Sequence, residues 1–195
     1  MRLILLSTVV LSAGIFGVGL AGCGESKPAT SATASETKPK AAVGASFFAS
    51  DRPADVKDLK AVRDGASKGD TVTFLARVGG RRNPFTDAQA IFVVTDPTLE
   101  SCEIMADDDH CSAPWDYCCE DSDNLKMNVA TVRFLDDGRP IRTNAKSAGG
   151  LDVLKFVVVT GTVNDINDEG LFIVDADSVW VGGKPKFGEP RLGSK

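Results

Sequence analysis

The stretch GDTVTFLARV, residues 69–78, begins the part of the chain that decides the fold. Apolar side chains occupy every second position from Val72 to Val78, and threonine, leucine and arginine lie between them. A period of two indicates a strand with its two faces in different surroundings. Four further runs rich in apolar residues have the length and composition of strands. We expect them over residues 88–95, 127–135, 154–163 and 171–181.

Five strands at this spacing favour a small barrel or sandwich. GDTVTFLARV, together with FVVVTGTV (156–163) and LFIVDADSVWV (171–181), resembles the first strand and the last hairpin of bacterial OB-fold domains. A short connection over 143–152, with room for a turn or two of helix, agrees with the OB-fold order. The resemblance implies a mainly β, five-stranded OB-fold-like barrel over residues 69–183. The chain departs from that pattern at Ala76, where glycine is frequent, and in a very long connection between strands 2 and 3.

The N-terminus carries Arg2, an apolar run and then Leu20-Ala21-Gly22-Cys23. This combination resembles a bacterial lipoprotein signal with its lipobox. The resemblance implies that residues 1–22 are a signal peptide and that Cys23 carries a lipid. We therefore expect a cell-envelope protein that faces the periplasm on a lipid anchor. Gly24 follows the cysteine, where an aspartate would favour retention at the inner membrane, so the outer membrane is the expected destination. The alternative to a lipoprotein signal is an ordinary signal peptide with a chance cysteine at position 23.

Three segments outside the barrel have distinct compositions. Residues 23–49 are rich in Ser, Thr, Ala, Lys and Pro, which predicts a disordered tether. Residues 50–68 predict a helix, because Ser50 or Asp51 can cap it and Pro53 suits its first turn. We expect residues 184–195 to form a flexible tail.

Residues 97–126 form an insertion between strands 2 and 3 with four cysteines, Cys102, Cys111, Cys118 and Cys119. An oxidising compartment and an even number of cysteines favour two disulfides. Adjacent side chains of an extended chain point in opposite directions, so Cys118 and Cys119 are expected to have separate partners. Cys102 pairs with either of them and Cys111 with the other, and the sequence leaves both arrangements open.

A metal site is the alternative interpretation of the insertion, with Cys102, His110, Cys111, Cys118 and Cys119 as candidate ligands among many carboxylates. The spacing C-x8-C-x6-C-C differs from the C-x2-C pairs of common structural zinc sites. A redox pair is a further alternative, although the insertion has no C-x-x-C motif. The stretch CSAPWDYCC (111–119) resembles a segment of uncharacterised secreted proteins from planctomycete-type bacteria, and this resemblance implies no function. Trp115 and Tyr117 are expected to form a small core for the insertion.

The loop GGRRNPF, residues 79–85, is the candidate ligand-binding loop. Arg81 and Arg82 supply guanidinium donors and Phe85 supplies an aromatic ring. In OB-folds this loop and the one between strands 4 and 5 border the ligand face. The latter loop, residues 164–170, is acidic and would repel phosphates. The structural alternative is a tight turn whose arginines pair with the acidic insertion.

The composition limits the choice of function. The net charge of −5 makes nucleic acid an unfavourable partner. The chain has a single histidine and lacks the common hydrolase and phosphate-binding motifs, so we expect no catalysis and no cofactor. The sequence favours a lipid-anchored binding or assembly module for an unknown protein or small ligand. The alternatives are a metal-binding or redox protein and a domain that binds oligonucleotides or oligosaccharides.

Overall fold

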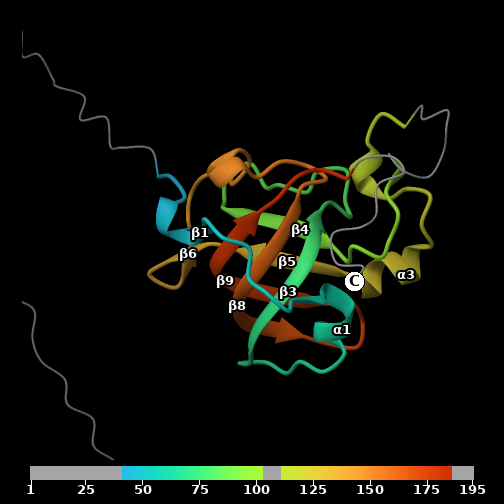
Figure 1. Ribbon diagram of the computed structural model, residues 1–195, viewed down its shortest axis with the longest axis horizontal. Helices are drawn as coiled ribbons and strands as arrows, with labels where there is room; N and C mark the ends of the chain where they lie inside the picture. Colours follow the sequence, from blue (N-terminus) through green and yellow to red (C-terminus); the bar gives the residue numbers. More distant parts are fainter. Residues whose placement is uncertain (1–40, 103–110, 186–195) are drawn as a thin grey trace, which may run out of the picture. The chain divides into compact units, whose positions relative to one another are not determined.

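A computed structural model of the chain describes residues 41–102 and 111–185 (Figure 1). All of these residues belong to one compact unit. The predicted signal peptide, Cys23, most of the predicted tether, His110 and residues 186–195 of the predicted tail lie outside the described residues. Within the described ranges, no helix has the length and apolar character needed to cross a membrane.

The five expected strands are present and close into a barrel. They are β3 (Thr71–Val78), β4 (Ile91–Thr95), β5 (Val129–Arg133), β8 (Phe156–Ile166) and β9 (Phe172–Val181). β3 pairs with β4, β4 with β5, β5 with β9, β9 with β8, and β8 again with β3. Only the pair β5–β9 is parallel in this ring. This order confirms the prediction of a mainly β, OB-fold-like barrel.

The alternation in the first barrel strand determines which side chains fill the interior. Phe74, Ala76 and Val78 of β3 are fully buried in the main core. In the same core, the ring of Phe74 lies 6.0 Å from that of Phe172, and Phe92 stacks at 5.5 Å on Phe134. The opposite face of β3 is also covered. Leu75 belongs to a second, smaller apolar cluster, and Arg77 is buried beneath the insertion.

The prediction of a tether up to residue 49 is wrong for its last five residues. The segment begins with a short 3-10 helix, η1 (Ala45–Phe47), and continues as β1 (Phe48–Ala49), which pairs in parallel with β9. The ring of Phe47 lies 5.1 Å from that of Phe134. Two adjacent phenylalanines therefore attach the chain to the barrel before the predicted boundary.

The prediction of a helix over residues 50–68 is wrong in its extent. The structure has a two-residue strand, β2 (Lys57–Asp58), which pairs in parallel with β3, and a short helix, α1 (Leu59–Arg63). Asp55 has a φ of 52°, which a continuous α-helix cannot accommodate. Val56 packs on the smaller apolar cluster around Leu75. The first two turns of the expected helix are therefore replaced by an irregular segment with bends, followed by the short strand β2.

The connections carry the remaining short elements. The insertion contains the 3-10 helix η2 (Pro114–Asp116) and ends in α3 (Ser122–Met127), which takes the place of the expected start of the third strand. After β5 a small hairpin follows, made of β6 (Leu135–Asp136) and β7 (Arg139–Pro140). The expected helical turn between β5 and β8 is η3 (Ala148–Gly150).

Candidate functional site

The β3–β4 loop and the insertion are packed directly against each other. The backbone N–H of Gly80 donates a hydrogen bond of 2.8 Å to the carbonyl of Trp115. In return, the indole Nε1 of Trp115 donates a 2.9 Å bond to the carbonyl of Arg82. A Cβ atom on Gly79 would lie 2.6 Å from the Trp115 carbonyl oxygen and 2.9 Å from Tyr117 Cε2. Glycine at position 79 is therefore required for this close approach.

The structure does not bring the three candidate residues of this loop to one surface. Arg81 and Arg82 are exposed, whereas Phe85 is only 9% exposed and stacks on Phe92 in the core. Arg81 lines one hollow, while Arg82 and Phe85 line another. Across the described residues, neither arginine forms an ion pair, so the predicted pairing with acidic side chains of the insertion is not seen there.

The hollow beside Arg81 lies between the β3–β4 loop, α3 and the β8–β9 turn, and we call it the hairpin pocket. Its volume is about 480 Å³. Its lining combines two cations, one carboxylate, two other polar side chains and an apolar strip. The lining residues are Gly80, Arg81, Ser122, Leu125, Lys126, Val129, Asn167, Glu169, Gly170 and Leu171.

A buried arginine from α1 ties together two walls of the hairpin pocket. Arg63 is 5% exposed, and its Nη1 donates to the carbonyl of Met127 at 2.7 Å and to that of Lys126 at 3.3 Å. Its Nη2 donates to the carbonyl of Asn167 at 3.2 Å. Burial lowers the pKa of the Arg63 guanidinium, and the charges of Asp64 and Asp168 oppose this effect. The sequence analysis did not identify Arg63, although this residue lies one helical turn from Leu59, which is fully buried.

The β8–β9 turn is held by its own side chains. Asn167 Oδ1 accepts hydrogen bonds from the backbone N–H groups of Glu169 at 3.0 Å and Leu171 at 2.9 Å. Gly170 has a φ of 105°, and a Cβ atom there would collide with the side chain of Lys126. The turn therefore lies against α3, and hydrogen bonds within the protein hold both walls of the pocket.

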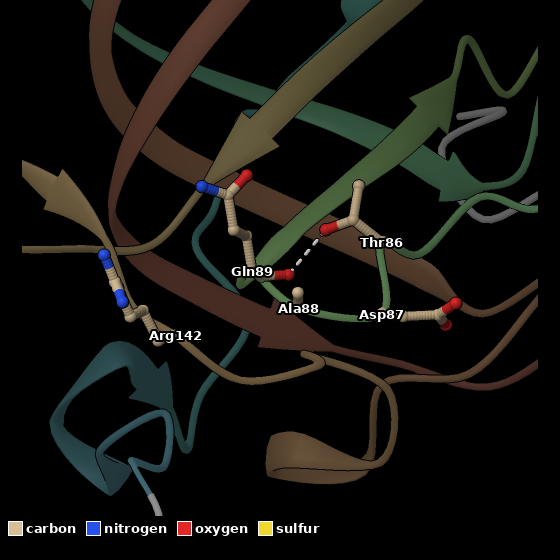
Figure 2. A pocket seen from close by; sticks show the side chains of 5 residues that line it. All are labelled: Thr86, Asp87, Ala88, Gln89 and Arg142. Atoms are coloured by element: carbon tan, nitrogen blue, oxygen red, sulfur yellow. Dashed lines mark hydrogen bonds between the residues drawn. The ribbon is translucent and has the colours of Figure 1, made fainter.

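Two other hollows are lined partly by residues of the β3–β4 connection. One, of about 300 Å³, includes Arg82, Phe85, Trp115 and Lys146 in its lining. The other, of about 450 Å³, is lined by Thr86, Asp87, Ala88, Gln89 and Arg142. In Figure 2, Arg142 and the Gln89 side chain lie on one side of the turn, and Asp87 points away from them. Thr86 Oγ1 donates a hydrogen bond of 2.6 Å to the Gln89 carbonyl, which holds the turn. Few polar side chains of this lining converge on one point where a ligand could bind.

The four cysteines of the insertion converge at one point beside the β3–β4 loop. Cys102 Sγ lies 3.7 Å from Cys119 Sγ and 3.9 Å from Cys118 Sγ. Cys118 Sγ lies 3.9 Å from Cys111 Sγ and 4.0 Å from Cys119 Sγ. A disulfide requires about 2.05 Å between the sulfurs, and each of these four distances is much longer. The two disulfides therefore stay a prediction.

The backbone at Tyr117 explains how two adjacent cysteines reach the same cluster. Tyr117 has left-handed φ and ψ angles of 59° and 37°. The N–H of Cys118 donates to Asp116 Oδ1 at 2.9 Å, and that of Glu120 donates to the Tyr117 carbonyl at 3.0 Å. The expectation that Cys118 and Cys119 point in opposite directions assumed an extended chain. The chain makes a turn there instead, which brings both sulfurs to one side.

Two of the thiols have altered acidity. Burial, together with a smaller contribution from the hydrogen bond with the Cys119 sulfur, raises the pKa of Cys102 to about 11. A side-chain hydrogen bond with Asp116 raises the pKa of the exposed Cys118, with the neighbouring thiols contributing in the same direction. At neutral pH both side chains are therefore thiols unless a cation compensates the negative charge.

Tyr117 forms the contact between the insertion and the barrel. It is 1% exposed, as is Arg77 of β3, whose guanidinium lies 5.5 Å from the Tyr117 ring centre. Arg77 also donates to the carbonyl of Leu99, at the start of the insertion. Burial raises the pKa of the Tyr117 hydroxyl, so it remains protonated. Tyr117 therefore packs onto the barrel, and a small core of the insertion made by Trp115 and Tyr117 stays a prediction.

Comparison of the chain with models of protein families, with curated protein sequences and with solved structures gives no match. The function is therefore inferred from the hairpin pocket, the cysteines and the sequence at the N-terminus.

Proposed function

We propose that this protein is a lipid-anchored binding module of the cell envelope that holds a small amphiphilic anion in the hairpin pocket without catalysing a reaction. The lipobox ending in Cys23 supports the anchor and the compartment. The OB-fold-like barrel supports a binding role, since OB-folds bind ligands beside the loops that border this pocket. The ligand class follows from the lining of the pocket.

The hairpin pocket presents cations and an apolar strip to the same volume. Arg81 and Lys126 are both exposed at its rim. Leu125, Val129 and Leu171 supply the apolar part, and Leu171 is 38% exposed, an unusual value for a leucine of this barrel. A ligand with one anionic group and a short apolar body would meet both. Glu169 and the neighbouring acidic residues disfavour a phosphate or another multiply charged anion.

The observation that carries this proposal is the set of hydrogen bonds that joins the pocket walls. Arg63 joins α3 to the β8–β9 turn through three carbonyls, and Asn167 closes the turn. A pocket that is already formed avoids the cost of ordering loops during binding. This property favours a binding site over an incidental surface hollow.

The experiment uses the fluorescent probe 8-anilinonaphthalene-1-sulfonate, an apolar monoanion. The double variant Arg81→Ala/Lys126→Ala should bind it at least about tenfold more weakly, since each lost charge contact contributes on the order of 1 kcal/mol. The control is Arg82→Ala/Lys146→Ala, which removes the same charges from the neighbouring hollow and should leave the affinity unchanged. Equal affinity in both double variants would contradict the proposed site.

The anchor has a separate test. Cys23→Ser should move the protein from the detergent phase to the aqueous phase after phase separation, because the thiol that receives the lipid is gone. Ser112→Ala serves as the control for expression and folding. Detergent-phase partitioning that survives Cys23→Ser would refute the lipid anchor without affecting the pocket.

A further inference from the structure

The sulfurs of the four insertion cysteines lie close together, at separations that suit ligands of one metal ion, and we call these residues the thiol cluster (Cys102, Cys111, Cys118 and Cys119). A metal bound by four thiolates at about 2.3 Å has its sulfurs about 3.8 Å apart along each edge of the tetrahedron. Four edges of the thiol cluster measure 3.7, 3.9, 3.9 and 4.0 Å. The edge between Cys102 and Cys111 is shorter than 4.8 Å.

We propose that the thiol cluster binds one thiophilic divalent cation, with Zn²⁺ as the reference ion, and that this ion closes the insertion in place of two disulfides. Thiolates select soft or borderline metals, and four of them in a tetrahedron suit zinc. The unusual spacing C-x8-C-x6-C-C is compatible with one ion because the turn at Tyr117 directs both adjacent sulfurs to the same side. The site lies outside the hairpin pocket and does not depend on the ligand proposed for it.

The barrel holds both ends of the chain that carries these ligands. Upstream, Arg77 binds the Leu99 carbonyl, and Ser101 and Cys102 are buried. Downstream, Tyr117 is buried on the β3–β4 loop immediately before Cys118. The ligands therefore come from two separately anchored points, and an ion between them would cross-link the beginning and the end of the insertion.

One cation, Arg77, contacts the residue that precedes Cys118, and one carboxylate, Asp116, lies beside the sulfurs. One divalent cation with four thiolates carries a net charge of −2, and the buried guanidinium of Arg77 stacks on Tyr117 directly beneath the insertion. An oxygen of Asp116 lies within 4.8 Å of the sulfurs of Cys102, Cys111 and Cys118 and is a competing donor. We assign the fourth position to Cys119, because a thiophilic ion prefers thiolate to carboxylate.

The test begins with the full chain purified in detergent under anaerobic conditions without added metal. We expect one zinc per chain by elemental analysis and four reactive thiols at the insertion after unfolding in a chelator. Replacement by Co²⁺ should give the thiolate-to-cobalt charge transfer and the intense d–d bands of a tetrahedral site. A metal-free protein with a mass deficit of about 4 Da, the signature of two disulfides, would overturn the proposal.

Variants distinguish the site from adventitious binding. Cys118→Ser and Cys119→Ser change exposed residues, so each should fold and should bind Zn²⁺ at least about 100-fold more weakly in competition with a chelator. Ser112→Ala, an exposed residue next to Cys111, should keep the parent affinity. Circular dichroism checks that each variant is folded. Parent-like Zn²⁺ affinity in both folded cysteine variants would also overturn the proposal.

Discussion

Arg63→Met is the substitution that most directly tests how the hairpin pocket is built. Methionine keeps much of the length of the side chain and its apolar contacts but removes the donors to the carbonyls of Lys126, Met127 and Asn167. Hydrogen bonds from a charged donor contribute about 1.5–3 kcal/mol each, and the values are not additive. We expect the free energy of unfolding to fall by about 3–5 kcal/mol, because the carbonyls lose a buried partner.

The assay is urea unfolding followed by tryptophan fluorescence, with Lys60→Met as the matched control. Lys60 is on the same helix, and its side chain is 49% exposed in an ion pair with Asp64 at 2.8 Å. Such a surface pair contributes no more than about 0.5 kcal/mol. A loss below about 1 kcal/mol for Arg63→Met, or equal losses for the two variants, would refute the role assigned to Arg63.

Three further substitutions test other parts of the structure. Gly79→Ala places a methyl group 2.6 Å from the Trp115 carbonyl oxygen and should displace the insertion, lowering Zn²⁺ affinity at least about tenfold in chelator competition. Asp116→Asn should change the Zn²⁺ affinity by less than about tenfold, because the carboxylate is not one of the assigned ligands. A loss of Zn²⁺ affinity as large as that of Cys118→Ser would show that Asp116 is a ligand. Gly161→Ala should destabilise the barrel by about 1–3 kcal/mol in urea unfolding, because the added methyl group would collide with the Asp175 carbonyl. The control Gly65→Ala adds a methyl group in open space and should change the free energy of unfolding by no more than about 0.5 kcal/mol. Equal effects of the two substitutions would contradict the packing at β8–β9.

The barrel could be predicted from the sequence because its signal is local. The alternation in residues 72–78 and the apolar runs of the later strands identify all five strands, and their order limits the topology. The boundaries were less predictable, because the ends of strands and helices depend on contacts with distant residues. Phe47 and Phe48 pack on Phe134, and no pattern in the neighbouring sequence indicates that contact.

The sites were harder to predict, because they depend on where the backbone turns. A left-handed Tyr117 is uncommon for an aromatic residue, and this one angle changes the relation between Cys118 and Cys119. Phe85 follows two exposed arginines and an asparagine, but its position opposite Phe92 turns it into the core. Arg63 is charged and would therefore be expected at the surface, although its helical spacing from Leu59 places it on the buried side of α1.

X-ray absorption at the zinc edge of the full chain is the most direct measurement of what closes the insertion. A centre made by Cys102, Cys111, Cys118 and Cys119 predicts a first shell of four sulfur atoms at about 2.3 Å. A first shell with an oxygen or nitrogen atom at about 2.0–2.2 Å, or a protein that binds no zinc because its sulfurs are paired, would contradict the four-thiolate centre.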